Sequence, residues 1–239
     1  MKLKKIYPAL QQALEENGFT EPTQLQKDSF GTIKSGVDAV LIAPKSQGKT
    51  TAIVINVIQR LEKEFMESPR ALIFVQDKPK VLEMMELFER LGKHTDLRVY
   101  GVHEKTNLDE DKNQISMGID VLIGTPVRLG EMFGGAGFDV NQLKMFILDD
   151  ADILLKARNE TRIARISDGI AKVQRLFFTE EIIERVEVLA DRLMIEPLFF
   201  EMEEGDEDEE EIDGEFIEDN DGFDEGTDDE NIIEHPQNK

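Results

Sequence analysis

Short hydrophobic runs recur along the first two hundred residues, and each has the length of a buried β-strand. The runs are rich in aliphatic, β-branched and aromatic side chains and contain few charges. They occupy residues 39–43, 71–75, 97–102, 120–123, 145–148, 176–178 and 198–200. We therefore expect about seven strands.

The stretches between these runs have hydrophobic residues at the spacing of amphipathic helices. One contains Ile53, Val57 and Leu61, and another contains Met84 and Phe88. Strands that alternate with helices make right-handed crossovers, which give a parallel sheet covered on both faces. The pattern predicts an α/β domain with a parallel sheet of about seven strands, helices on both faces, and ligands at the C-terminal edge of the sheet.

The last part of the chain differs sharply in composition. From residue 201 onward there are 20 Asp and Glu residues and one Lys, while the whole chain has a net charge of -23. With few hydrophobic residues, this part cannot offset an ordering entropy of about 1–2 kcal/mol per residue. We predict a folded domain over residues 1–202 and a disordered acidic tail over residues 203–239.

Residue usage also limits the kinds of site. The absence of Cys excludes disulfides and thiolate metal sites, and three widely spaced His residues do not suggest a local metal site. No stretch approaches the ~20 hydrophobic residues that span a bilayer, and the N-terminus lacks the hydrophobic core of a signal peptide. We expect a soluble, cytoplasmic protein that does not contact membranes.

The residues after the first hydrophobic run have the pattern of a phosphate-binding loop. Residues 43–50 read Ala-Pro-Lys-Ser-Gln-Gly-Lys-Thr and stand between a predicted strand and a predicted helix. Backbone N–H groups there can hold phosphates, a lysine can reach the β and γ groups, and a threonine can ligate Mg²⁺. The alternative is a chance tripeptide, but its position favours binding of ATP with Mg²⁺. The predicted nucleotide-binding residues are Ser46, Gln47, Gly48, Lys49, Thr50 and Thr51.

With its surroundings, this loop resembles the first RecA-like domain of the DEAD-box ATP-dependent RNA helicases, over about residues 10–202. Residues 18–26, Gly-Phe-Thr-Glu-Pro-Thr-Gln-Leu-Gln, are similar to the family's Q motif. The resemblance implies that Phe19 and Gln26 bind the nucleotide and that Gln26 reads adenine. A carboxamide suits that role because it can donate to a ring nitrogen and accept from the amine. Without the family, Gln26 would be an ordinary helix residue.

The resemblance also implies residues that contact RNA. Residues 118–129 are similar to the strand and Thr-Pro-Gly-Arg motif that touches the RNA backbone, with Thr125 and Arg128 retained and Val127 in place of glycine. A structural turn is the alternative there. Where relatives have Pro-Thr-Arg-Glu-Leu, this chain has Gln-Asp-Lys-Pro-Lys at residues 76–80, so only Lys78 preserves the cation. Gly101 matches one member of the family's glycine pair, and we expect weak RNA binding through these residues.

After the run at residues 145–148, Asp-Asp-Ala-Asp at residues 149–152 stands where the family has its name-giving tetrad. By resemblance, Asp149 holds Mg²⁺ through water together with Thr50, and Lys49, Asp149 and Asp150 carry catalysis. A solvated strand end is the alternative.

Asp150 departs from the family, which has a glutamate there to orient and deprotonate the attacking water. The carboxylate is retracted by one carbon–carbon bond, about 1.5 Å, and misplacement of that order costs about a hundredfold in rate. We therefore expect weak ATP hydrolysis.

Two further departures concern the same site. Ser46 replaces a glycine, which makes the torsions of the loop harder to reach. Thr-Glu-Glu at residues 179–181 replaces the Ser-Ala-Thr motif that couples hydrolysis to unwinding. Thr179 still offers a hydroxyl to Asp152, but the added negative charge opposes a triphosphate. These changes favour a second hypothesis, in which the chain is a pseudo-ATPase that serves as a nucleotide-responsive protein-interaction module.

No arginine follows Arg192, so the arginine fingers of the family's second RecA-like domain have no counterpart in this sequence. Such fingers contribute about 10³–10⁵ in rate. We expect no unwinding by this chain alone and a protein partner that supplies a second domain. The acidic tail either imitates a nucleic-acid backbone, attracts a basic partner, or is a solubilising extension.

Overall fold

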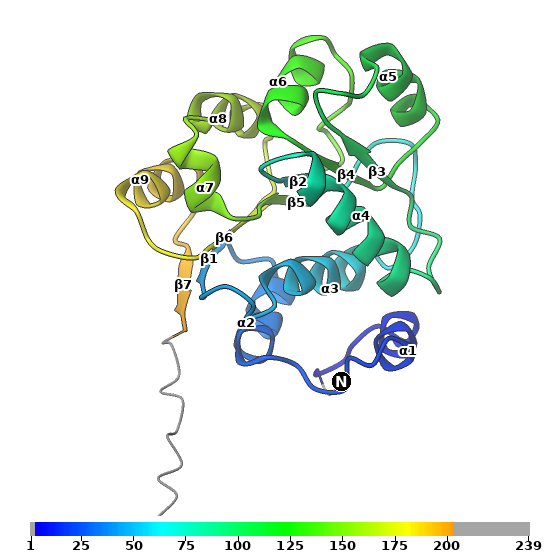
Figure 1. The fold of residues 1–239 in the computed structure, drawn as a ribbon, viewed down its shortest axis with the longest axis vertical. Helices are drawn as coiled ribbons and strands as arrows, with labels where there is room; N and C mark the ends of the chain where they lie inside the picture. The colour runs from blue at the N-terminus through cyan, green and yellow to red at the C-terminus, as the bar shows by residue number, and fades with distance from the viewer. Residues whose placement is uncertain (1–2, 203–239) are drawn as a thin grey trace, which may run out of the picture. The chain divides into compact units, whose positions relative to one another are not determined.

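All seven hydrophobic runs form β-strands in the computed structural model, which describes residues 3–202 (Figure 1). The strands are β1 (Ala39–Ile42), β2 (Ala71–Phe74), β3 (Val99–Val102), β4 (Val121–Gly124), β5 (Met145–Leu148), β6 (Gln174–Thr179) and β7 (Leu198–Glu201). The predicted disordered tail, residues 203–239, lies outside the described residues.

Helices occupy the stretches between the strands and also precede the first strand. They are α1 (Pro8–Glu16), α2 (Gln24–Ser35), α3 (Lys49–Leu61), α4 (Lys78–Leu91), α5 (Leu108–Ser116), α6 (Pro126–Gly134), α7 (Ala151–Lys156), α8 (Glu160–Asp168) and α9 (Glu184–Leu193). Thr23, Asp77 and Thr125 cap α2, α4 and α6, because each side chain accepts a backbone N–H of the first turn. Within residues 3–202, no helix is long and hydrophobic enough to cross a membrane.

The strands form one sheet in the order β3-β4-β2-β5-β6-β1-β7, and every neighbouring pair is parallel. Phe74 at the end of β2 lies opposite Leu148 at the end of β5. The parallel α/β sheet predicted from the sequence is therefore confirmed, and its register brings the segments after β2 and β5 together.

Helices cover both faces of the sheet, so the domain has two hydrophobic cores (Figure 1). Leu41 and Ile73 face α1 to α4, whereas the alternate residues Val40 and Leu72 face α5 to α9. Burial of each such side chain stabilises the fold by roughly 1.5–3 kcal/mol. Because both faces are buried, the strands read as continuous hydrophobic runs rather than as alternating patterns.

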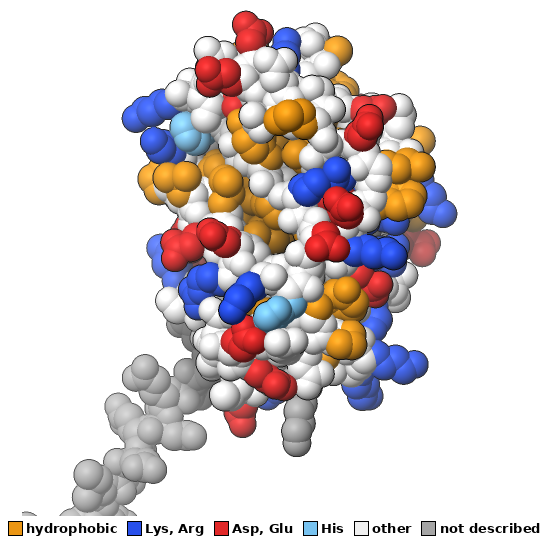
Figure 2. Space-filling model, turned by 90° about the vertical axis from the view of Figure 1, so that its right-hand side faces the viewer, with side chains coloured by type: hydrophobic (Ala, Val, Ile, Leu, Met, Phe, Trp, Pro, Cys, Tyr) orange, Lys and Arg blue, Asp and Glu red, His pale blue; other side chains and the backbone are white. Residues whose placement is uncertain are grey.

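Figure 2 shows one side of the domain, with hydrophobic side chains across its middle and charges of both signs around them. A hollow of about 530 Å³ on α4 and the edge strand β3 is lined by Leu82, Met85 and Phe88 and by the charged residues Glu86 and Lys93. A surface of mixed charge does not form the continuous basic stripe that is typical of nucleic-acid binding. This side is therefore a poor candidate for the RNA-binding face.

Candidate nucleotide-binding site

The phosphate loop between β1 and α3 closes around the amino group of its own lysine. Lys49 is 7% exposed, and its Nζ donates to the carbonyl oxygens of Ala43 (2.7 Å) and Pro44 (3.0 Å). Gly48 precedes α3 with a φ of 79°, and a Cβ there would lie 2.9 Å from Nε2 of Gln26. The loop thus places a cation at a helix N-terminus, with a glycine at the position where a side chain would not fit.

Ser46 reaches a backbone conformation that favours glycine. Its φ is 64°, which lies in the left-handed region, where an L-residue is disfavoured by roughly 1–2 kcal/mol. The loop therefore adopts its bend at an energetic cost, as the replacement of glycine by Ser46 predicts.

Of the two residues predicted to bind the nucleoside, Gln26 contacts this loop and Phe19 contacts α4. Gln26 is 5% exposed; its Oε1 accepts from the backbone N–H of Thr23 (3.1 Å), and its Nε2 donates to the carbonyl oxygen of Gly48 (3.3 Å). Each polar atom of the carboxamide retains capacity for one more hydrogen bond. Phe19 is half-buried beneath the guanidinium of Arg90, which lies 6.0 Å from the ring centroid.

Two other predicted residues, Gln47 and Thr51, are half-buried at the end of the loop and in the first turn of α3. They lie beside Gly48 and Lys49 along the chain. The phosphate loop therefore brings together all of its predicted members at the C-terminal edge of β1.

Thr50 and Asp149 meet although 99 residues separate them in the chain. The hydroxyl of Thr50 donates to Oδ2 of Asp149 at 3.4 Å. Asp149 is 2% exposed, and its Oδ1 has no hydrogen-bond partner among the described residues. Burial, and then the like charge of Asp150, raises the pKa of Asp149 to about 7.

These oxygens fit Mg²⁺, a hard cation that prefers oxygen ligands. The unpartnered Oδ1 of Asp149 is a buried acceptor that a cation or its water would satisfy. Among residues 3–202, no group of three or more His, Cys, Asp or Glu side chains is arranged to hold a metal ion. The residues therefore suit an ion that keeps several waters and is also bound by phosphates.

Asp150 starts the turn into α7 with a φ of 51°, a left-handed conformation that Asp tolerates better than most residues. Its side chain is partly buried. Burial raises the pKa of Asp150, and the nearby cations Lys80 and Lys49 oppose that shift. The positive charges of two lysines therefore act on the carboxylate that is predicted to act as base.

Asp152 and Thr179 are in direct contact. The hydroxyl of Thr179 lies 3.0 Å from Oδ1 of Asp152 and 2.8 Å from the carbonyl oxygen of Glu181, so it can donate to either. The backbone N–H of Glu180 also donates to Asp152, at 3.3 Å. The end of β6 is thereby attached to the start of α7; a coupling role for the pair stays a prediction.

The two glutamates that follow Thr179 point to different cations. Glu180 lies 3.5 Å from the amino group of Lys45 in the phosphate loop, whereas Glu181 lies 2.5 Å from that of Lys156 in α7. Only Glu180 also contributes to the raised pKa of Asp150. Glu180 therefore brings an extra negative charge to the nucleotide site.

Three of the predicted RNA-binding residues lie in different environments. Lys78 is exposed at the start of α4. Gly101 lies within β3, where a Cβ would clash with the side chain of Met85 in α4, so packing explains this glycine. Thr125 is 2% exposed and donates to Oε1 of Glu104 at 2.9 Å. Of these three side chains, Lys78 is the one placed to contact a ligand in solution.

Arg128 has an interior role. It is 6% exposed, and its guanidinium donates to the carbonyl oxygens of His103 (Nε, 2.9 Å) and Thr106 and to Glu131 (3.3 Å). Asp111, 1% exposed, lies 3.8 Å from the same guanidinium. These contacts hold the segment between β3 and α5, and the RNA contact of Arg128 stays a prediction.

Lys80 is a residue of this site that sequence reasoning missed. It lies in the first turn of α4, its side chain is 25% exposed, and its Nζ is 3.2 Å from Glu83. Burial opposes its charge, but the carboxylates of Asp149, Glu83 and Asp150 outweigh burial and raise the pKa of Lys80. The sequence does hold a signal for Lys80: it places a cation where the Pro-Thr-Arg-Glu-Leu motif of relatives ends in leucine.

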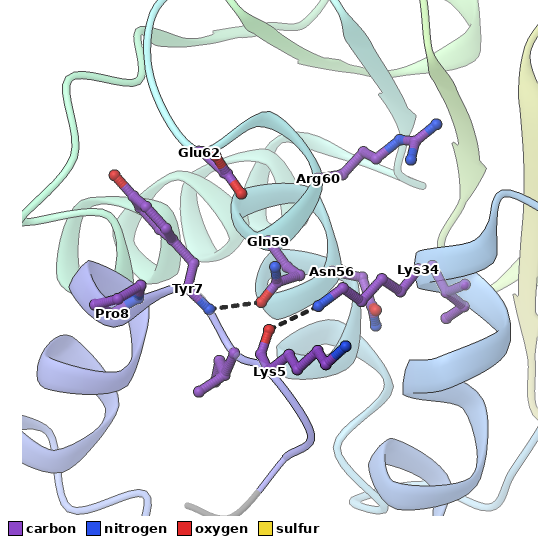
Figure 3. A pocket seen from close by; sticks show the side chains of 10 residues that line it. Lys5, Tyr7, Pro8, Lys34, Asn56, Gln59, Arg60 and Glu62 are labelled. Atoms are coloured by element: carbon purple, nitrogen blue, oxygen red, sulfur yellow. Dashed lines mark hydrogen bonds between the residues drawn. The ribbon is translucent and has the colours of Figure 1, made fainter.

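A separate hollow of about 340 Å³ lies between the N-terminal segment and helices α2 and α3 (Figure 3). Polar contacts cross it: the backbone N–H of Tyr7 donates to Gln59 (2.7 Å), and Lys34 donates to the carbonyl oxygen of Lys5 (2.6 Å). The hollow follows the seam along which the N-terminal segment packs on the domain. It is not the phosphate site, because Gln59 lies in the last turns of α3, whereas Lys49 begins that helix.

Comparison with known proteins gives a consistent picture. Residues 23–180, well over half of the chain, match the family described as DEAD/DEAH box helicase. The chain is 30% identical over 166 residues to the ATP-dependent RNA helicase eIF4A of Eremothecium gossypii, covering 70% of this chain and 41% of that protein. It is 32% identical over 140 residues to the ATP-dependent RNA helicase DHH1 of Yarrowia lipolytica, covering 59% of this chain and 27% of that protein.

A solved structure of the yeast DEAD-box splicing factor Prp28 has the same fold, with a TM-score of 0.78 and 22% identity. The match covers 86% of this chain and 52% of that one. The chain spans less than half the length of the curated relatives that it matches. Because the family match extends from the cap of α2 to the end of β6, the chain belongs to the DEAD/DEAH box helicase family.

Proposed function

We propose that this chain is a nucleotide-binding domain that takes ATP with Mg²⁺, contacts RNA weakly and hydrolyses ATP slowly or with a partner. The observation that carries the proposal is the meeting of Thr50 and Asp149 beside the phosphate loop. A hydroxyl, a buried carboxylate with a free oxygen, and a lysine at a helix N-terminus together match the needs of a metal-bound polyphosphate.

The side chains that would bind the nucleotide and its metal ion already lie at or near the phosphate loop. The amino group of Lys49 exchanges two neutral carbonyl partners for phosphate oxygens, which form stronger charge-assisted hydrogen bonds. Gln26 offers its remaining N–H and lone pair to adenine. Thr50 and Asp149 would hold Mg²⁺, which neutralises charge that develops on the transferred phosphoryl group.

In this proposal hydrolysis depends on Asp150, whose carboxylate would accept a proton from the attacking water. A general base must lie within about 2.6–3.2 Å of its proton source, and the shorter side chain withdraws it by about 1.5 Å. We therefore propose turnover about a hundredfold below that of a glutamate at this position, and no unwinding of RNA by the chain alone.

A second candidate function is a pseudo-ATPase that acts as a nucleotide-responsive protein-interaction module. The strained Ser46, the short Asp150 and the extra charge of Glu180 favour it, because all three oppose efficient turnover. Under this hypothesis nucleotide binding persists while hydrolysis is lost.

A protein partner is part of the proposal. Since the relatives are more than twice as long as the matched region, a partner that supplies a second RecA-like domain would restore a complete catalytic centre. A basic partner suits the acidic residues 203–239, which contain 19 of the 51 acidic side chains. The proposal also includes a cytoplasmic location for the protein.

ATP turnover with RNA present distinguishes the two candidates. Asp150→Glu should raise the rate by up to about a hundredfold, and Lys49→Ala should abolish it. Turnover that is absent in both the native chain and Asp150→Glu, with ATP binding intact, would reject the enzyme in favour of the interaction module.

A further inference from the structure

The strand β7 lies at one edge of the sheet, and its outer side pairs with no other strand of residues 3–202. It pairs in parallel with β1 and stands last in the strand order (Figure 1, orange). The backbone N–H groups of Leu198 and Met202 donate to carbonyl oxygens on the β1 side, each at 3.0 Å. Because successive N–H groups of a strand point to opposite sides, those of Phe199 and Glu201 point away from β1. Their N–H and C=O groups form a row with which a further strand can pair.

The side chains of β7 add exposed hydrophobic surface on both faces of this edge. Leu198 is 47% exposed and Phe199 is 50% exposed. By register, Leu198 lies opposite Ala39 of one hydrophobic core, whereas Phe199 lies opposite Val40 of the other. Phe199 belongs to neither core within the described residues. An added strand would therefore bury hydrophobic area as well as form backbone hydrogen bonds.

The strand at the other edge, β3, offers less side-chain surface. Its first three residues are half-buried and Val102 is buried. The hydroxyl of Tyr100 donates to Asp111 of α5 at 3.0 Å, and Gly101 faces the side chain of Met85 in α4. Of the two edges, β7 is therefore the one at which an added strand gains more contact.

The charges around β7 indicate the kind of strand that fits. Glu196, just before the strand, and Glu201, at its end, are both exposed, and residues 203 and 204 are also glutamates. Among the described residues, no cationic side chain lies within ion-pair distance of Glu196 or Glu201. Opposite charges on facing residues of neighbouring strands stabilise the pair, and like charges destabilise it. A strand that carries Lys or Arg is therefore favoured over an acidic one.

We propose that the outer side of β7 is a docking site for an extended, basic segment of a partner protein, which joins the sheet as a further strand. The backbone groups of Phe199 and Glu201 hold the segment, its hydrophobic side chains pack on Leu198 and Phe199, and its basic side chains pair with Glu201. None of the predicted nucleotide-binding or RNA-binding residues lies in β7. The inference goes beyond the proposed function by giving the basic partner a surface on the folded domain, and it does not depend on nucleotide binding.

The experiment uses the full chain and two peptides of equal charge. One is Lys-Lys-Val-Val-Lys-Lys-Val-Val, and the other has proline in place of each valine. The acidic residues of the chain attract both, but proline lacks the N–H that strand pairing needs. Calorimetry measures the affinity for each peptide, and NMR measures hydrogen exchange at individual backbone amides of the chain.

The valine peptide should bind the native chain about tenfold more tightly than the proline peptide, the effect of one or two backbone hydrogen bonds. It should also slow exchange at the amides of Phe199 and Glu201. The amides of Leu198 and Met202 are internal controls, because they already donate to β1 and should change little.

Two substitutions test the backbone and the charge separately. Phe199→Pro removes an N–H that β1 does not use, so the chain should still unfold cooperatively but lose its preference for the valine peptide. Glu201→Lys should lower that preference about threefold. Glu86→Lys, on the exposed side of α4, is the matched control and should leave the preference unchanged.

Three results would overturn the proposal. The first is equal affinity of the native chain for the two peptides, or exchange at Phe199 and Glu201 that the valine peptide does not slow; it needs no variant to fold. The second is a native chain that is dimeric in sedimentation and monomeric as Phe199→Pro, which would assign the edge to a second copy. The third is slow exchange at both amides before peptide is added, which would show that the chain itself already pairs with this edge. ATP binding enters none of these measurements, so failure here is distinguishable from failure of the nucleotide site.

Discussion

Replacement of Asp149 by asparagine tests the electrostatics of the site through the stability of the fold. The carboxyl of Asp149 has a pKa of about 7 in the folded chain, against about 3.9 when unfolded. Between these values the folded chain holds a proton that the unfolded chain has released, so the free energy of unfolding falls as pH rises. Asparagine does not titrate and removes this loss.

The magnitude follows from a shift of about three pKa units, each worth 1.36 kcal/mol. Asp149→Asn should match the native chain near pH 4 and exceed its free energy of unfolding by about 4 kcal/mol at pH 8. Between pH 5 and 6 the difference should grow by about 1.3 kcal/mol per pH unit, and more slowly as the pH passes 7. Burial of the side chain to 2% exposure justifies use of the full shift.

Urea unfolding at pH 5.5, 7 and 8.5, without metal or nucleotide, measures this difference. The control is Asp191→Asn, which removes an exposed carboxylate on α9. Mg²⁺ should then stabilise the native chain and the control but not Asp149→Asn. A difference between Asp149→Asn and the native chain that is constant over this pH range would refute the reasoning.

Three further substitutions test individual residues. Ser46→Gly should increase the free energy of unfolding by about 1 kcal/mol, because glycine adopts a φ of 64° without strain; a decrease in urea unfolding would contradict this. Glu180→Gln should tighten ATP binding about threefold to tenfold relative to ADP. Glu181→Gln is the control and should not, because Glu181 pairs with Lys156; equal effects of the two substitutions in competition titrations would contradict the role of Glu180. Arg128→Met should lower the free energy of unfolding by about 3 kcal/mol, since it leaves buried acceptors unpaired; unchanged stability in urea unfolding would contradict this, and RNA affinity measured at low temperature tests the predicted RNA contact of Arg128.

The strands could be predicted because a parallel sheet buried on both faces requires continuous hydrophobic runs. The start of β4 is an exception. Asp120 was predicted to begin a strand, but β4 starts at Val121 and Asp120 is fully buried. Its carboxylate accepts from Nε of Arg70 (3.1 Å) and of Arg98 (2.9 Å). Hydrophobic periodicity cannot indicate which distant arginines compensate a buried acid.

The phosphate loop could be predicted because its residues are contiguous and its chemistry follows from residue type. Lys80 and the pair Lys45–Glu180 could not, because they depend on which strands are neighbours in the sheet. Arg128 shows a different difficulty. The resemblance implies an RNA contact, which stays a prediction, whereas the contacts that its buried guanidinium makes within the chain depend on the fold around it.

The most direct test of the account is a calorimetric titration of the purified chain with ATP and Mg²⁺, repeated with Lys49→Ala. We predict saturable binding by the native chain and an affinity about tenfold to a hundredfold lower for Lys49→Ala, the loss expected for a charged hydrogen bond. No binding heat and no thermal stabilisation by any adenine nucleotide would contradict the assignment of this site.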